Sequence, residues 1–98
     1  MKEYKIEIKI TGQLIGKGYY VSLEGQEIFL KENPEHVYTR TFDAFPVENP
    51  LDIVIILNGW FGTEWTAEVK VNGAPILSRN GAFPKKGNVN IVEHIKLS

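Results

Sequence analysis

Hydrophobic and polar residues alternate with a period of two along most of the chain. From residue 4 to residue 10, every second position is bulky and apolar, and the positions between them are charged. Successive side chains of an extended strand point to opposite faces, so this pattern predicts a strand with one buried and one solvated face. A helix would spread the same apolar side chains around most of its circumference. The apolar positions are Tyr4, Ile6, Ile8 and Ile10, and the charged positions are Lys5, Glu7 and Lys9.

Residues 19–23 and 26–31 have the pattern of a β-hairpin. The sequence leaves open whether the turn is Glu24-Gly25 or Gly25-Gln26. Both registers place the same side chains on one face, so the expected burial does not depend on the choice. Those side chains are Tyr19, Val21, Leu23, Ile28 and Leu30.

The middle of the chain is expected to contain two strands and a connection between them. After a break at Pro34, residues 37–42 resume an extended pattern. Residues 43–50 include two prolines and are expected to form a connection. Residues 51–57 are nearly continuously apolar, which is typical of a strand covered on both faces, and we expect this strand to be the most central one.

The last third of the chain carries the strongest hairpin signal. Residues 64–71 alternate, with Trp65 in phase with the buried positions. Asn72-Gly73 follows and suits a type I′ turn, which needs positive φ at both central residues. Pro75 lacks an amide hydrogen, so the short segment after the turn is expected at a sheet edge. Residues 78–88 are expected to form a long polar loop, and residues 89–97 the last strand.

These elements predict one all-β domain over residues 1–98. About seven strands with turn signals every 8–12 residues favour an antiparallel β-sandwich of immunoglobulin-like or Greek-key type. A small closed β-barrel is the alternative. The stretch GTEWTAEVKVNG is similar to segments of many small bacterial sandwich domains, a likeness too general to assign a role to any residue.

Composition narrows the chemistry and the partners. The chain has no cysteine, which excludes disulfides, zinc–thiolate sites and thiol nucleophiles. Its formal net charge is −1, so neither nucleic acid nor an anionic membrane is an expected partner. The first ten residues contain no apolar leader, so the chain as written is expected in the cytoplasm. Removal of a leader from a longer precursor would instead make it an exported protein.

Two aromatic residues in an expected turn form the main candidate site. Trp60 and Phe61 stand between Gly59 and Gly62. Adjacent residues of an extended chain face opposite ways, so we expect one of the two aromatics to point outward unless the loop folds back. The pair either closes one end of the core or forms a surface that binds a partner, because aromatic side chains bury a large area with few rotatable bonds.

The ionisable residues show no motif for catalysis or metal binding. His36 and His94 are far apart in sequence, and a metal pair would need Asp43 or Asp52 beside them. The acids around residues 43–52 lack calcium-loop spacing. No serine stands in a nucleophile elbow. We therefore expect no cofactor, no metal and no catalytic residue. The basic positions Arg79, Lys85 and Lys86 have the density of an ordinary polar loop.

The sequence thus favours a non-catalytic module that recognises a protein partner through an edge strand or the aromatic loop. A homodimer through sheet faces is a further hypothesis, because Val54, Ile56 and Val92 occupy positions that a one-sided sheet leaves polar. The alternative is a carbohydrate-binding module, and the third is a small hydrolase-like enzyme with a histidine near a carboxylate in a cleft. The candidate ligand-binding residues are Trp60, Phe61, Tyr19, Tyr20, Asn58 and Glu64.

Overall fold

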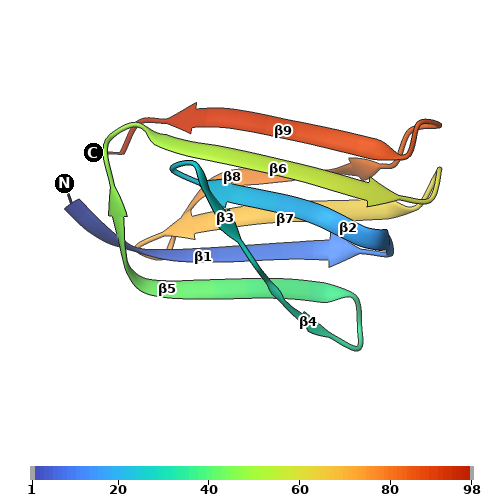
Figure 1. Ribbon diagram of the computed structural model, residues 1–98, viewed down its shortest axis with the longest axis horizontal. Coiled ribbons are helices and arrows are strands. Elements are labelled where there is room, and N and C mark those ends of the chain that lie inside the picture. The colour runs from blue at the N-terminus through green and yellow to red at the C-terminus, as the bar shows by residue number, and fades with distance from the viewer. Residues whose placement is uncertain (1, 98) are drawn as a thin grey trace.

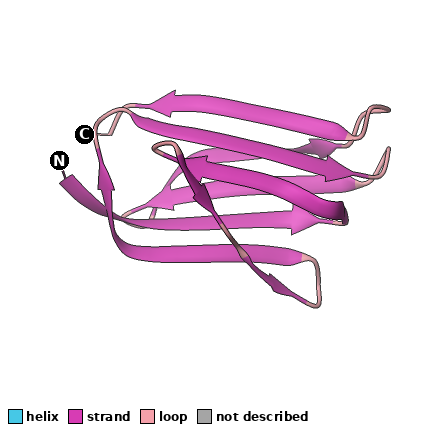
Figure 2. Cartoon of the chain, in the orientation of Figure 1, coloured by secondary structure: helices cyan, strands magenta, loops and turns pink. Residues whose placement is uncertain are grey.

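Two antiparallel sheets pack face to face in the computed structural model, which describes residues 2–97 apart from the side-chain surroundings of positions 16 and 17 (Figures 1 and 2). The five-stranded sheet has the order β4-β5-β1-β7-β8, and the four-stranded sheet has the order β3-β2-β6-β9. The strands are β1 (Lys2–Gly12), β2 (Leu14–Leu23), β3 (Gln26–Ile28), β4 (Lys31–Asn33), β5 (Val37–Val47), β6 (Leu51–Gly59), β7 (Glu64–Val71), β8 (Ala74–Ala82) and β9 (Asn88–Ile95). The predicted β-sandwich is confirmed, and the two sheets do not close into the alternative barrel.

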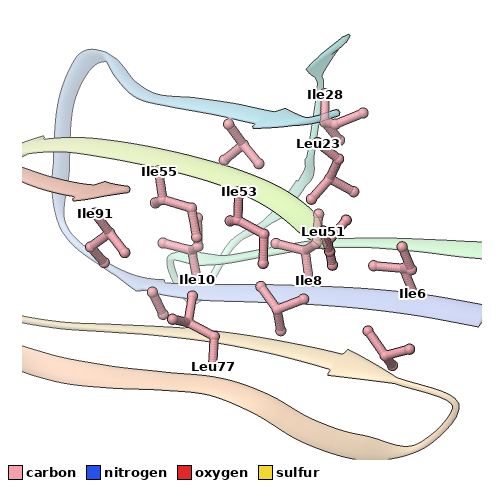
Figure 3. Close-up of a cluster of buried hydrophobic side chains, with 14 of the residues drawn as sticks. Ile6, Ile8, Ile10, Leu23, Ile28, Leu51, Ile53, Ile55, Leu77 and Ile91 are labelled. Atoms are coloured by element: carbon pink, nitrogen blue, oxygen red, sulfur yellow. The ribbon is translucent and has the colours of Figure 1, made fainter. Parts of the chain in front are cut away.

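The core lies between the sheets and is built from the alternating positions of the sequence (Figure 3). The predicted inner face of β1 is buried, and so are the inner positions of β7, including Trp65. β6 lies between β2 and β9, and its four inner residues are fully buried, as expected for a central strand. Burying each such side chain contributes about 1.5–3 kcal/mol. The four β6 residues are Leu51, Ile53, Ile55 and Leu57.

Both predicted tight turns form. Glu24 and Gly25 have φ of 53° and 76°, which selects the first of the two possible hairpin registers. Asn72 and Gly73 have φ of 51° and 82°, as a type I′ turn requires. The predicted second strand over residues 26–31 is divided, however. β3 ends at Ile28, and the chain then crosses to the other sheet to form β4, in front of the sandwich in Figure 1.

Two segments that the sequence predicts as connections are strands. β5 continues to Val47 because a bulge opposite Lys5 resets its phase, after which Phe45 and Val47 are buried. Pro46 is tolerated there because β4 pairs only with residues 37–39, so within residues 2–97 no strand pairs with Pro46 on the side away from β1.

β8 is the second such segment, because it continues to Ala82 through the expected polar loop. It forms the edge of the five-stranded sheet, where polar residues remain in contact with water. The loop prediction is therefore wrong for residues 43–47 and 78–82, whereas residues 48–50 and 83–87 do connect strands.

Candidate functional site

The turn between β6 and β7 carries the two aromatic residues at one end of the sandwich (Figure 1). The Trp60 carbonyl accepts hydrogen bonds from the Thr63 amide at 3.1 Å and from the Thr63 hydroxyl at 2.8 Å. Gly62 has φ of 85°, which is typical of the third position of a type II turn. Trp60 is 63% exposed and Phe61 is 65% exposed. We call residues 60–63 the aromatic tip.

The β8–β9 loop fixes the backbone of the aromatic tip. The Gly62 amide donates to the Phe83 carbonyl at 2.9 Å, and the Phe83 amide donates to the Thr63 carbonyl at 2.9 Å. The Gly59 amide donates to the Gly87 carbonyl at 2.8 Å. The tip is therefore a braced turn whose two aromatic side chains are presented on a fixed backbone.

Phe83, not the tip, closes this end of the core. Its ring is buried and lies 6.4 Å from the ring of Trp65. A Cβ at Gly59 would lie 2.2 Å from the Phe83 ring, so only glycine fits above it. Because Phe83 fills the space, neither Trp60 nor Phe61 needs to turn inward. Both aromatics are exposed, whereas the sequence suggested that only one would be.

Two more of the predicted residues flank the tip. Asn58 is exposed next to Gly59 and is paired with Asn88 of β9. Glu64 is exposed at the start of β7 and borders a shallow, open depression of about 530 Å³. The depression also contains His36 and Trp65. Four of the six predicted residues therefore gather at this end of the molecule, and they offer hydrogen-bonding groups beside the aromatic pair.

Tyr19 is not part of this surface. Its hydroxyl accepts a hydrogen bond from the Leu30 amide at 2.8 Å and donates to the Leu30 carbonyl at 3.2 Å. Its ring is half-buried, 5.7 Å from the ring of Tyr38. Burial raises the pKa of Tyr38. The Glu32 carboxylate, which accepts a hydrogen bond from the Tyr38 hydroxyl at 3.2 Å, raises this pKa further. Tyr19 thus holds the segment that crosses between the sheets.

Tyr20 belongs to a different surface, the outer face of the four-stranded sheet. It is 39% exposed and is paired with Ile56 of β6, which precedes Trp60 by four residues. At about 3.3 Å per residue, the Cα atoms of Ile56 and Trp60 are about 13 Å apart along the direction of β6. The same outer face carries Val54 on β6 and, paired with it on β9, Val92, which is 58% exposed. The six predicted residues therefore divide into the tip group, the outer-face Tyr20 and the structural Tyr19.

The histidines lie on open surface. His94 Nδ1 contacts the Asp52 carboxylate on the outer face of β9 and β6, where both side chains are largely exposed. His36 is exposed in the β4–β5 turn. Within residues 2–97 no group of three or more histidine, cysteine or acidic side chains is arranged to hold a metal ion. Nor do these residues contain a helix that is long and apolar enough to cross a membrane.

The sequence analysis did not predict the positions of three further apolar residues, one of which closes the end of the core and two of which are exposed. Phe83 lies in a range predicted as polar loop, and its only signal was an aromatic residue among charges. Phe29 is 66% exposed because the chain leaves β3 just before it. Ile15 is exposed within a bulge of β2, where residues 15–18 lie between the pairs Leu14–Gly59 and Tyr19–Leu57.

Comparison of the chain with family models, with curated proteins and with solved structures found no match.

Proposed function

We propose that this chain is a non-catalytic module that binds a protein partner through the aromatic tip. The observation that carries the proposal is the exposure of two adjacent large aromatics on a backbone held by hydrogen bonds from Gly59, Gly62, Thr63 and Phe83. Aromatic side chains have few rotatable bonds, and the tip backbone is already held, so ordering this surface on binding costs little conformational entropy. Tryptophan at the centre of an interface often contributes 2 kcal/mol or more.

The surroundings of the tip fit a protein interface. Asn58 and Glu64 flank it along the chain, and the exposed Lys85 and Lys86 follow Phe83 in the bracing loop. An apolar centre with a polar and charged rim is the usual anatomy of a protein–protein contact. The complementary surface is an apolar pocket or groove deep enough to take Trp60, bordered by groups that pair with these charges.

The carbohydrate alternative receives less support. Aromatic faces stack on sugar rings through CH–π contacts, and the sequence suggested that Tyr19 or Tyr20 would lie beside Trp60 on such a surface. Tyr19 instead has its hydroxyl bonded to Leu30, and Tyr20 is paired with Ile56, which precedes Trp60 by about 13 Å along the direction of β6. The hydrolase alternative is also less supported, because His94 and Asp52 meet on open surface where water has full access.

A matched pair of variants tests the proposal. Proteins captured by the wild-type chain are first identified and purified. Calorimetry then measures the affinity of each for the wild type, for the double variant Trp60→Ser/Phe61→Ser and for Phe29→Ser. The second variant also removes an exposed aromatic, but from the segment that crosses between the sheets. We expect the tip variant to bind at least about tenfold more weakly, since a hot-spot tryptophan alone accounts for more than 1.4 kcal/mol. Phe29→Ser should bind like the wild type.

Equal affinity of the tip variant and the wild type would overturn the proposal. The fluorescence of Trp60 provides a second readout, because Trp65 is buried and Trp60 is exposed. A blue shift on addition of a glycan, absent in Trp60→Phe, would favour the carbohydrate alternative instead.

A further inference from the structure

β9 is the least protected sheet edge in the described part of the chain. The other edges are β3 and β4, which have three residues each, and β8, which contains Pro75 and lies opposite a register shift at Val69/Lys70. β9 has eight residues, no proline and an unbroken register with β6. Edges are normally shortened, bent or interrupted because their free backbone groups pair with other strands. β9 is therefore the edge best suited to accept another strand.

The backbone groups that β9 leaves free can be assigned by alternation. The Gly59 amide donates to the Gly87 carbonyl, in line with the β6–β9 register, and the Glu24 amide donates to the Asp52 carbonyl on the other side of β6. The backbone groups of odd-numbered β6 residues therefore point toward β9, and those of even-numbered β6 residues point toward β2. Hydrogen-bonded pairs alternate along an antiparallel ladder, so even-numbered residues of β9 point their backbone groups away from β6. These residues are Asn88, Asn90, Val92 and His94.

The side chains of β9 are self-complementary about Val92. An antiparallel copy centred there places Val92 opposite the partner's Val92, as a hydrogen-bonded pair on the outer face. Asn90 then lies opposite the partner's His94, and the half-buried Val89 lies opposite the partner's Ile95. Cross-strand apolar pairs and polar pairs of this kind each stabilise a sheet by about 0.2–1 kcal/mol.

One kind of pair in this register is unlike, and it occurs once on each side of the axis. The register places Ile91 opposite the partner's Glu93, which would bring a carboxylate beside an apolar side chain. Within each chain, however, the Glu93 carboxylate accepts a hydrogen bond from the Arg79 guanidinium at 3.2 Å. This ion pair directs Glu93 toward β8 and balances its charge, so the unlike pair does not block the register.

We infer that two copies of this chain associate by antiparallel pairing of their β9 strands about a two-fold axis at Val92. The two four-stranded sheets become one continuous eight-stranded sheet. Its outer face carries an unbroken apolar row from Val54 and Val92 to the same residues of the second copy. A palindromic pattern of this kind favours a second copy over an unrelated strand, because a two-fold interface must be complementary to itself. One strand pair buries less than a standard interface, so the dimer is expected to form reversibly with concentration.

Cysteine cross-linking tests the register directly, because the chain has no cysteine of its own. Opposed residues of a hydrogen-bonded pair have Cα atoms about 5.5 Å apart, within the range that a disulfide spans. Val92→Cys should therefore form a covalent dimer under mild oxidation. Asn90→Cys alone and His94→Cys alone should not, since each position lies four residues, or about 14 Å, from its own copy. A mixture of these two variants should cross-link.

Sedimentation equilibrium then tests the association itself. We expect the weight-average mass of the wild type to rise by about half over a hundredfold rise in concentration around the dissociation constant. Val92→Lys should weaken the dimer at least about tenfold, because it places two like charges at the axis. Ile56→Lys is the matched control, because it changes the same outer face one strand away from the edge. It should leave the dissociation constant within about twofold of the wild type.

Any of three results would overturn the inference: a wild type that stays monomeric, cross-linking of Asn90→Cys alone, or dissociation by Ile56→Lys but not by Val92→Lys.

Discussion

At the scale of single residues, Gly59 determines which aromatic side chain is buried at this end of the molecule. A Cβ at this position would lie 2.2, 2.5 and 2.6 Å from three atoms of the Phe83 ring. Because glycine has no side chain, Phe83 can lie over the backbone of β6 and fill the end of the core. Trp60 and Phe61 then remain outside. The exposure of Trp60 and Phe61 thus follows from the absence of a side chain at Gly59, which lets Phe83 fill the end of the core.

A double-mutant cycle tests this coupling. Gly59→Ala should lower the free energy of unfolding by about 1–3 kcal/mol, because the new methyl group overpacks against Phe83. Phe83→Leu should cost about 1–2 kcal/mol, because it removes buried ring atoms. In the double variant the leucine lacks the ring atoms that clash, so the combined loss should be smaller than the sum of the two. Urea denaturation gives the three values. Strict additivity would show that the two residues are independent.

At the scale of elements, the alternating pattern predicted the strands that bury one face and missed the segments that do not follow this rule. β1 and β7 were found because every second residue is buried by the opposite sheet. The second half of β8 was missed because an edge strand carries polar side chains, so Ser78 to Ala82 has the composition of a loop. The end of β5 was missed because a bulge shifts the alternation by one residue.

The candidate site was predictable to a similar extent. A Trp-Phe pair between two glycines indicates a turn with large side chains, and this much of the tip follows from local sequence. The separation of Tyr19 and Tyr20 from the tip does not, because the β2 bulge over residues 15–18 and the crossing of the chain after Ile28 determine it. Both features result from packing of distant segments, which a single sequence does not encode in any local pattern.

The β7–β8 hairpin has a second attachment besides its turn. The Asn72 side-chain oxygen accepts a hydrogen bond from the Lys5 amide at 3.0 Å, and the Asn72 amide donates to the Lys5 carbonyl at 2.8 Å. Asn72→Gly keeps the positive φ and loses only the side-chain bond, so it should lower the unfolding free energy by about 1 kcal/mol. Asn72→Ala also forces an alanine to a φ of 51° and should cost about 1 kcal/mol more. Thermal denaturation of both variants measures the two contributions, and equal stabilities would contradict the assignment.

At the scale of the whole molecule, a two-layer sandwich has two open flanks that must be closed between the sheets. On the flank of β8 and β9, the ion pair of Arg79 and Glu93 bridges the two edges. On the opposite flank, the segment between β3 and β4 crosses from one sheet to the other (Figure 1). Arg40 donates to the Phe29 carbonyl at 3.0 Å, and Tyr19 bonds both backbone groups of Leu30. The ion pair leaves the backbone of β9 available as an edge. The crossing segment, in contrast, covers the opposite flank.

Tyr19→Phe should open the covered flank without disturbing the rest of the sandwich. It removes both hydrogen bonds to Leu30, so the free energy of unfolding should fall by about 1–2 kcal/mol. Hydrogen exchange at the Leu30 amide should accelerate at least about tenfold. Tyr20→Phe is the matched control, since it deletes the hydroxyl of the adjacent, partly exposed tyrosine and should change stability by less than about 0.5 kcal/mol. If the two variants exchange Leu30 at the same rate, the crossing segment is held by its apolar contacts, and the Tyr19 hydroxyl does not close this flank.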